Sequence, residues 1–144
     1  MKKVKVKCKR VSKIKSKEDV RLFKKAYREV FSCGAAVCNY YEDPEDSIEF
    51  IIGIVYNRVV GIIEVEKHKY GRHSLNMVFV MKSYRKMGVL RAMIEYLLKR
   101  NDRLFWNAAE TAIPAYRSLG AKQGSSNDFR LTRKMYNKFR GTNL

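Results

Sequence analysis

The chain has 144 residues and a formal net charge of +17, because 31 lysine and arginine residues outnumber 14 aspartate and glutamate residues. Hydrophobic residues make up 46% of the chain, a share that is ordinary for a folded protein and excludes an intrinsically disordered one. The apolar runs are too short to cross a membrane, and no apolar signal region follows the lysine-rich start. We therefore expect one cytoplasmic domain over residues 1–144.

The positive charge is spread along the whole chain and is not confined to a tail. Such an excess predicts an acidic partner, which could be nucleic acid, a ribosome, another polyanion, or only the phosphates of a cofactor. The alternative is that the lysines serve solubility. The cysteines are odd in number and form no paired motif, so we expect reduced thiols and no metal site at Cys8, Cys33 and Cys38.

The first third of the chain predicts a strand and then a helix. Residues 3–14 alternate between lysine and apolar side chains, as in a half-buried strand whose lysines protect a sheet edge. Ser16 is the expected N-cap of the helix, and apolar residues recur at helical spacing from Val20 to Phe31. Gly34 is its expected end, and an acidic break follows at residues 42–46.

The rest of the chain alternates between strand and helix patterns. Two strands are expected at residues 47–56 and 59–66, with a tight turn at Asn57–Arg58. An apolar strand at 75–81 leads through a basic turn into a helix that begins near Val89. After it we expect a strand at 104–108, a helix at 111–119 capped by Thr111, and strand-like pieces at 129–132 and 135–139. This order predicts an α/β fold with a mixed sheet.

The turn before Val89 has the character of a phosphate-binding site. The first N–H groups of a helix have no partner within it, and the helix dipole adds partial positive charge there. Arg85 and Lys86 add two full charges, and Gly88 permits close approach of a ligand to the backbone. The alternative is an ordinary connection with solvated lysines.

The residues around this turn also resemble a family motif. Residues 80–90, VMKSYRKMGVL, resemble the acetyl-CoA-binding motif of the GNAT superfamily of N-acetyltransferases, which is Arg/Gln-x-x-Gly-x-Gly/Ala between a strand and a helix. Arg85 and Gly88 match this motif, and Leu90 stands where the family has Gly or Ala. That leucine is expected to crowd the site.

A second segment resembles the same superfamily. Residues 112–121, AIPAYRSLGA, are similar to its segment AI-x-x-Y-x-x-x-G-F, in which Tyr116 and Gly120 match and Ala121 replaces the usual Phe. The resemblance implies a single-domain GNAT-like fold with a central mixed, mostly antiparallel sheet flanked by helices.

The resemblance further implies acetyl-CoA as the cofactor. An exposed strand edge would pair with the pantetheine arm by strand addition, and we expect Val78, Phe79 and Val80 to supply it. The backbone of the turn would hold the pyrophosphate through Arg85, Lys86, Met87, Gly88, Val89 and Leu90.

Catalytic roles follow from the same resemblance. Tyr116 matches the general acid that protonates the departing CoA thiolate. Many family members use a carboxylate base on the strand where Asn76 and Met77 stand here, so Glu64 and Glu66 on the preceding strand are the expected substitutes. His73 is a weaker candidate, and either glutamate could instead be structurally neutral. The acceptor-binding loop would contain Tyr40, Tyr41, Glu42 and Asp43, although a solvated loop is the alternative.

Two functions remain open from the sequence. The resemblance implies an acetyl-CoA-dependent N-acetyltransferase, a monomer or homodimer, that acts on a primary amine of a protein, polyamine or small metabolite. The alternative is a basic module of GNAT-like fold that binds nucleic acid or another polyanion, or that modifies a nucleic-acid-associated target.

Overall fold

The computed structural model describes residues 4–31 and 47–144. Within these residues, one seven-stranded sheet has the order β1-β2-β3-β4-β5-β7-β6. Neighbouring strands are antiparallel except β4 and β5, which run parallel. The strands are β1 (Lys7–Val11), β2 (Ile48–Val55), β3 (Arg58–Lys67), β4 (Arg72–Val80), β5 (Arg103–Asn107), β6 (Lys122–Gln123) and β7 (Asp128–Thr132).

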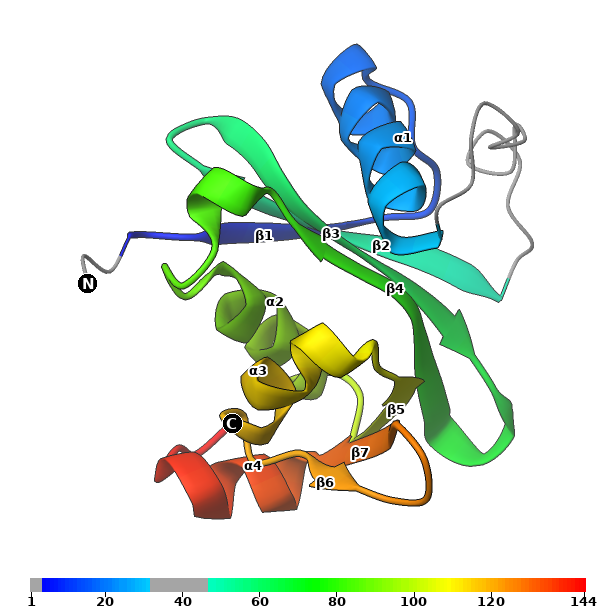
Figure 1. The fold of residues 1–144 in the computed structure, drawn as a ribbon, viewed down its shortest axis with the longest axis vertical. Coiled ribbons are helices and arrows are strands. Elements are labelled where there is room, and N and C mark those ends of the chain that lie inside the picture. Colours follow the sequence, from blue (N-terminus) through cyan, green and yellow to red (C-terminus); the bar gives the residue numbers. More distant parts are fainter. Residues whose placement is uncertain (1–3, 32–46) are drawn as a thin grey trace.

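Helices cover both faces of the sheet (Figure 1). Helix α1 (Lys17–Phe31) lies on one face, and α2 (Val89–Leu98) and α3 (Ile113–Arg117) lie on the other, where α4 (Arg133–Arg140) also packs. A buried cluster fills each side, with Phe23 of α1 against Phe50 in one and Met93 of α2 in the other. The predicted α/β fold with a mixed, mostly antiparallel sheet flanked by helices is confirmed.

The start of α1 also agrees with its prediction, because Ser16 Oγ accepts the N–H of Asp19 at 3.0 Å. The predicted end of that helix, Gly34, lies outside the described residues. None of the helices in the described part of the chain combines the length and the apolar character that crossing a bilayer requires.

Three local predictions are corrected. The β2–β3 turn is Tyr56–Asn57, with φ of 50° and 60°, because Arg58 already pairs with Val55; positive φ at both turn residues is what a tight two-residue hairpin requires. Thr111 is not a helix cap: it lies in a 3₁₀ turn (Glu110–Ala112), and α3 begins one residue beyond that turn.

The third correction concerns residues 135–139, which form part of α4 and not a strand. Thr132 Oγ1 accepts the N–H of Met135 at 3.1 Å, which is an N-cap. The apolar residues Met135, Tyr136 and Phe139 have the spacing of one helix face, and Tyr136 is fully buried.

Gly120 follows helix α3 and lies against Phe139 of α4. Gly120 has φ of +82°, and a Cβ added there would lie 2.6 Å from Phe139 Cγ of α4. Gly141 has a similar φ of +69° but open space around it. Substitutions at these two glycines therefore distinguish the cost of backbone strain from the cost of side-chain overlap.

We expect Gly120→Ala to lower the free energy of unfolding more than Gly141→Ala does. Both variants place alanine at positive φ, which costs about 1–2 kcal/mol. Only Gly120→Ala adds overlap with Phe139, so its loss should exceed the other by about 1–3 kcal/mol. Urea unfolding measures the free energy of unfolding of both variants. Equal losses would show that α4 moves to relieve the overlap at no energetic cost.

Candidate active site

A cleft lies at a fork between β4 and β5. The two strands pair only over Arg72–Ser74 and Arg103–Phe105. Beyond Ser74 they separate, and a cleft of about 1270 Å³ opens between them. It is lined by β4 from Leu75 onward, by the turn before α2, by the end of β5 and by α3.

The predicted pantetheine-binding edge lies in this cleft. Val78, Phe79 and Val80 pair with β3 along one edge of β4. In the part of the chain that the structure describes, no strand pairs with them along the other edge. That free edge faces the cleft and can accept an extended ligand as an added strand.

The basic turn lies at the end of this edge. Gly88 adopts the left-handed conformation with φ of +90°, and its carbonyl accepts the first hydrogen bond of α2 from Ala92 at 3.0 Å. Arg85 folds back onto the strand, where its Nε donates to the carbonyl of Val80 at 2.8 Å. The structure therefore places free helix N–H groups and positive charge together at the mouth of the cleft.

The cleft contains all of the predicted cofactor-binding residues from 78–80 and 85–90, including the half-buried Leu90. It also contains Arg91 and Arg140, which sequence reasoning missed. Arg140 reaches the cleft because α4 is fastened to α2, where Tyr136 Oη donates to Glu95 Oε2 at 2.8 Å. No local motif could have revealed a contact between residues so far apart in the chain.

Tyr116 lies in the same cleft, on the side that α3 forms. Its side chain is buried, and its ring packs against Trp106 at 5.0 Å and Phe129 at 5.7 Å between centroids. Burial raises the pKa of the Tyr116 phenol to about 12. The hydroxyl therefore keeps its proton at neutral pH, as a proton donor must.

Glu64 and Glu66 lie on the opposite face of the sheet. Their cross-strand partners on β2, Phe50 and Ile48, belong to the cluster under α1, and directly opposed residues share a face. Glu64 is buried, with 3% of its surface exposed, and Glu66 is half-exposed near the end of β3. The carboxylates and Tyr116 thus lie on opposite faces of the fork.

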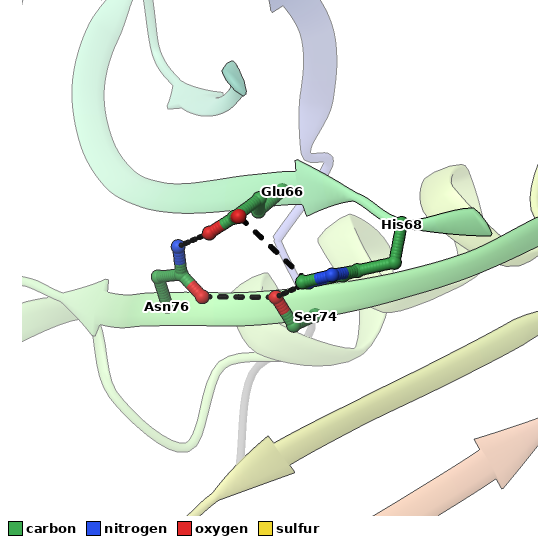
Figure 2. Close-up of polar contacts among 4 residues, drawn as sticks. All are labelled: Glu66, His68, Ser74 and Asn76. Atoms are coloured by element: carbon green, nitrogen blue, oxygen red, sulfur yellow. Dashed lines mark hydrogen bonds and ion pairs between the residues drawn. The ribbon is translucent and has the colours of Figure 1, made fainter. Parts of the chain in front are cut away.

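Glu66 belongs to a chain of polar side chains at the base of the fork (Figure 2). Its Oε1 accepts from Asn76 Nδ2 at 2.8 Å, and Asn76 Oδ1 accepts from Ser74 Oγ at 2.9 Å. Ser74 Oγ lies 2.8 Å from His68 Nε2, which is itself 4.0 Å from Glu66 Oε2. His73, the histidine singled out from the sequence, instead contacts the carbonyl of Gly71.

The predicted acceptor-binding residues lie outside the described residues, so the roles of Tyr40, Tyr41, Glu42 and Asp43 stay predictions, as do the states of Cys33 and Cys38. Cys8 is described, and burial raises the pKa of its thiol to about 11. The raised pKa keeps that thiol protonated at neutral pH, which is the less nucleophilic form.

Known structures share this fold at low sequence identity, which shows the fold alone. A solved structure from Exiguobacterium sp. 255-15 superposes with a TM-score of 0.69 at 21% identity, covering 93% of this chain and 97% of that one. A GNAT family acetyltransferase from Elizabethkingia anophelis with acetyl-CoA bound gives 0.66 at 7%, covering 88% and 97%. The ribosomal-protein-S18-alanine N-acetyltransferase from Escherichia coli gives 0.62 at 13%, covering 86% and 90%.

The sequence comparison identifies the family. No curated protein matches the chain. The sequence profile described as "Acetyltransferase (GNAT) domain" matches residues 14–130, which is most of the chain and includes the fork, the basic turn and Tyr116. The chain therefore belongs to the GNAT family of acetyltransferases.

Proposed function

We propose that this protein transfers the acetyl group of acetyl-CoA to a primary amine. The free edge of β4, which leads from the fork to the basic turn, is the observation that carries this proposal. An extended pantetheine arm fits such an edge, and a pyrophosphate fits the helix N-terminus at its end. The acetyl-CoA bound to the Elizabethkingia anophelis structure of the same fold supports this assignment.

Within this arrangement, Tyr116 donates a proton to the sulfur as the carbon–sulfur bond breaks. The raised pKa of the Tyr116 phenol keeps it protonated until negative charge develops on the sulfur, and the phenol then donates to the departing thiolate. Arg91 and Arg140 stand beside the cleft and can receive the remaining phosphate charge of the cofactor.

The amine must lose a proton before it attacks. A lysine-like amine with a pKa of about 10.4 is only about 0.04% neutral at pH 7, a deficit of about 4–5 kcal/mol. Glu64 and Glu66 lie on the face opposite Tyr116. Glu64 is buried there, whereas the carboxylate of Glu66 is partly exposed and favours an ammonium group that approaches from that face. Attack and departure would then occur on opposite sides of the fork.

The nature of the amine is the finer part of the proposal. The Escherichia coli enzyme of the same fold acts on an alanine of a ribosomal protein. A protein, a polyamine and a small amine metabolite all present the primary amine that the proposed chemistry requires.

Titration calorimetry with acetyl-CoA tests the proposal at its first step. We expect saturable binding, followed by thiol release when spermidine or a lysine-containing peptide is added. The control is desulfo-CoA, which has the same phosphates and should bind without turnover. If acetyl-CoA gives no heat up to about 1 mM, the upper end of usual KM values, the proposal is wrong.

A further inference from the structure

The chain of four polar side chains at the base of the fork has a fixed direction (Figure 2). An ionised carboxylate can only accept hydrogen bonds, so Glu66 requires the NH₂ group of Asn76 to face it. Asn76 must then turn its oxygen to Ser74, whose hydroxyl donates its one hydrogen to that oxygen. Ser74 has only lone pairs left for His68, so His68 Nε2 must carry the hydrogen of the contact between them.

The charge of Glu66 therefore sets the tautomer of His68 through two intervening side chains. Glu66 Oε2 lies 4.0 Å from the same Nε2 and favours a hydrogen there as well. With Nε2 protonated, the neutral imidazole has its lone pair on Nδ1. Within residues 4–31 and 47–144, Nδ1 of His68 makes no hydrogen bond, so this lone pair is not already used.

The position of these four hydrogen-bonded side chains connects them to the proposed reaction. Ser74 is the last residue of β4 that pairs with β5, and Asn76, two residues further, lines the cleft. Asn76 is the extra residue of a β-bulge, because Glu64 pairs with Met77 and the next residue of β3 pairs with Leu75. Bulges commonly re-aim a side chain next to an active site.

His68 is held at this place by its neighbours and yet remains accessible. Its ring packs on Phe105 of β5 at 5.4 Å between centroids, and 38% of its side chain is exposed. Besides Glu66, the charged group nearby is the guanidinium of Arg72, which lies 4.6 Å from the centre of the Phe105 ring. The adjacent Lys67 is paired with Glu49 at 3.7 Å.

We propose that His68 takes the proton from the ammonium form of the acceptor, with Glu66, Asn76 and Ser74 as the positioning residues that keep its Nδ1 lone pair available. This inference rests on the proposed function. An N–H bond of the ammonium group breaks and an Nδ1–H bond forms, which leaves a neutral amine and an imidazolium beside the Glu66 carboxylate. The amine attacks the thioester carbon and Tyr116 protonates the departing sulfur. The new amide nitrogen then loses its second proton to solvent, Tyr116 regains a proton from solvent, and the partly exposed imidazolium returns its own proton to solvent.

General acid–base chemistry favours histidine over glutamate for this step. Imidazole groups have a pKa of about 6.5 and carboxyl groups one of about 4.3, against about 10.4 for an alkylamine. Proton transfer to an imidazole is thus less unfavourable by about two powers of ten. The carboxylate serves better as the fixed charge beside the imidazolium that forms.

A matched pair of histidine variants tests the role. His68→Gln keeps an N–H donor for Ser74 but cannot take a proton, and we expect kcat with spermidine or a lysine-containing peptide to fall by about 10²-fold. His73→Gln changes the other histidine of the same hairpin, outside the polar chain, and should stay within about twofold. The dissociation constant of acetyl-CoA should be the same in both variants and the parent.

The pH profile adds a readout that a structural role would not move. In the parent, kcat/KM should fall on the acid side as an imidazole gains its proton, and this limb should be absent in His68→Gln. If His68→Gln turns over at the parent rate while the parent acetylates the amine, the inference fails and the proposed function stands. If the parent neither binds acetyl-CoA nor releases thiol, the proposed function itself fails.

The tautomer can be measured without any acceptor. In ¹⁵N-labelled parent protein at alkaline pH, the ring of His68 should show a protonated Nε2 and a bare Nδ1. Ser74→Ala removes the acceptor of the Nε2 hydrogen and Glu66→Gln removes the fixed charge, so the share of this tautomer should fall in both variants toward that of a free histidine. A parent protein whose His68 has its proton on Nδ1 would overturn the inference even if the enzyme is active.

Discussion

Tyr116→Phe should lower kcat by about 10²–10⁴-fold, the usual contribution of a general acid. The change removes only the hydroxyl, so the ring keeps its packing against Trp106 and Phe129. Burial raises the pKa of the phenol to about 12, so the group is protonated throughout the working range of pH. KM for acetyl-CoA should change little, because the hydroxyl acts mainly as negative charge develops on the sulfur.

Tyr136→Phe is the matched control for this prediction. Tyr136 is also a buried tyrosine, but its hydroxyl donates to Glu95 between α4 and α2. Its loss should cost about 1–3 kcal/mol of unfolding free energy, because Glu95 loses its donor, and leave kcat at saturating acetyl-CoA intact. Any kinetic change should fall on KM, because α4 carries Arg140 to the cleft. Thiol release from acetyl-CoA measures the rate, and parent-like turnover of Tyr116→Phe would show that this phenol is not the acid.

Gly88→Glu should weaken the binding of acetyl-CoA at least tenfold. A non-glycine residue at φ of +90° strains the turn by about 1–2 kcal/mol. The new carboxylate would stand beside the expected position of the pyrophosphate and oppose its charge. A Cβ at this position lies 3.9 Å from Arg91 Nη2, so the space is open and the effect arises from charge and backbone, not from overlap.

Gly88→Lys separates these two causes, because it has similar bulk and the same backbone strain but the opposite charge. Its dissociation constant for acetyl-CoA in calorimetry should fall between those of the parent and Gly88→Glu. A constant that is unchanged in Gly88→Glu would move the cofactor away from this turn.

The sequence predicted those parts of the fold that are encoded locally. The apolar strand, basic turn and helix around Gly88 are found as predicted. Within a few residues the sequence passes from an apolar run to basic side chains and then to helical spacing of apolar residues, and each of these patterns is local. Residues 135–139 were assigned to a strand because a short apolar run has no decisive period, and the N-cap at Thr132 was overlooked. The predicted turn, Asn57–Arg58, lies one residue beyond the observed turn, Tyr56–Asn57. Both pairs contain Asn57, a residue type that tolerates positive φ, so composition does not distinguish them.

The parts of the site that could be predicted from the sequence are likewise those encoded by local motifs. Tyr116 and the turn follow from motifs, whereas Arg140 and His68 reach their places through contacts between distant segments. His68 has no pattern of its own in the sequence, and only the bulge at Asn76 shows its connection to the cleft. Binding of nucleic acid or another polyanion stays a prediction from the charge of +17, because a charge count contains no geometry.

Because the parallel pairing of β4 with β5 is short, a small change of angle there is amplified along the diverging strands. Among the residues that the structure describes, three pairs join the two halves of the sheet there, next to Ser74 and Phe105. From Ser74 to the end of β4 at Val80, the strand extends about 20 Å at the usual rise per residue. A tilt of about 5° at the pairing would move the far end by about 2 Å over that length. Residues at the narrow end of the fork therefore set the angle at which the two halves of the sheet diverge toward the turn around Gly88.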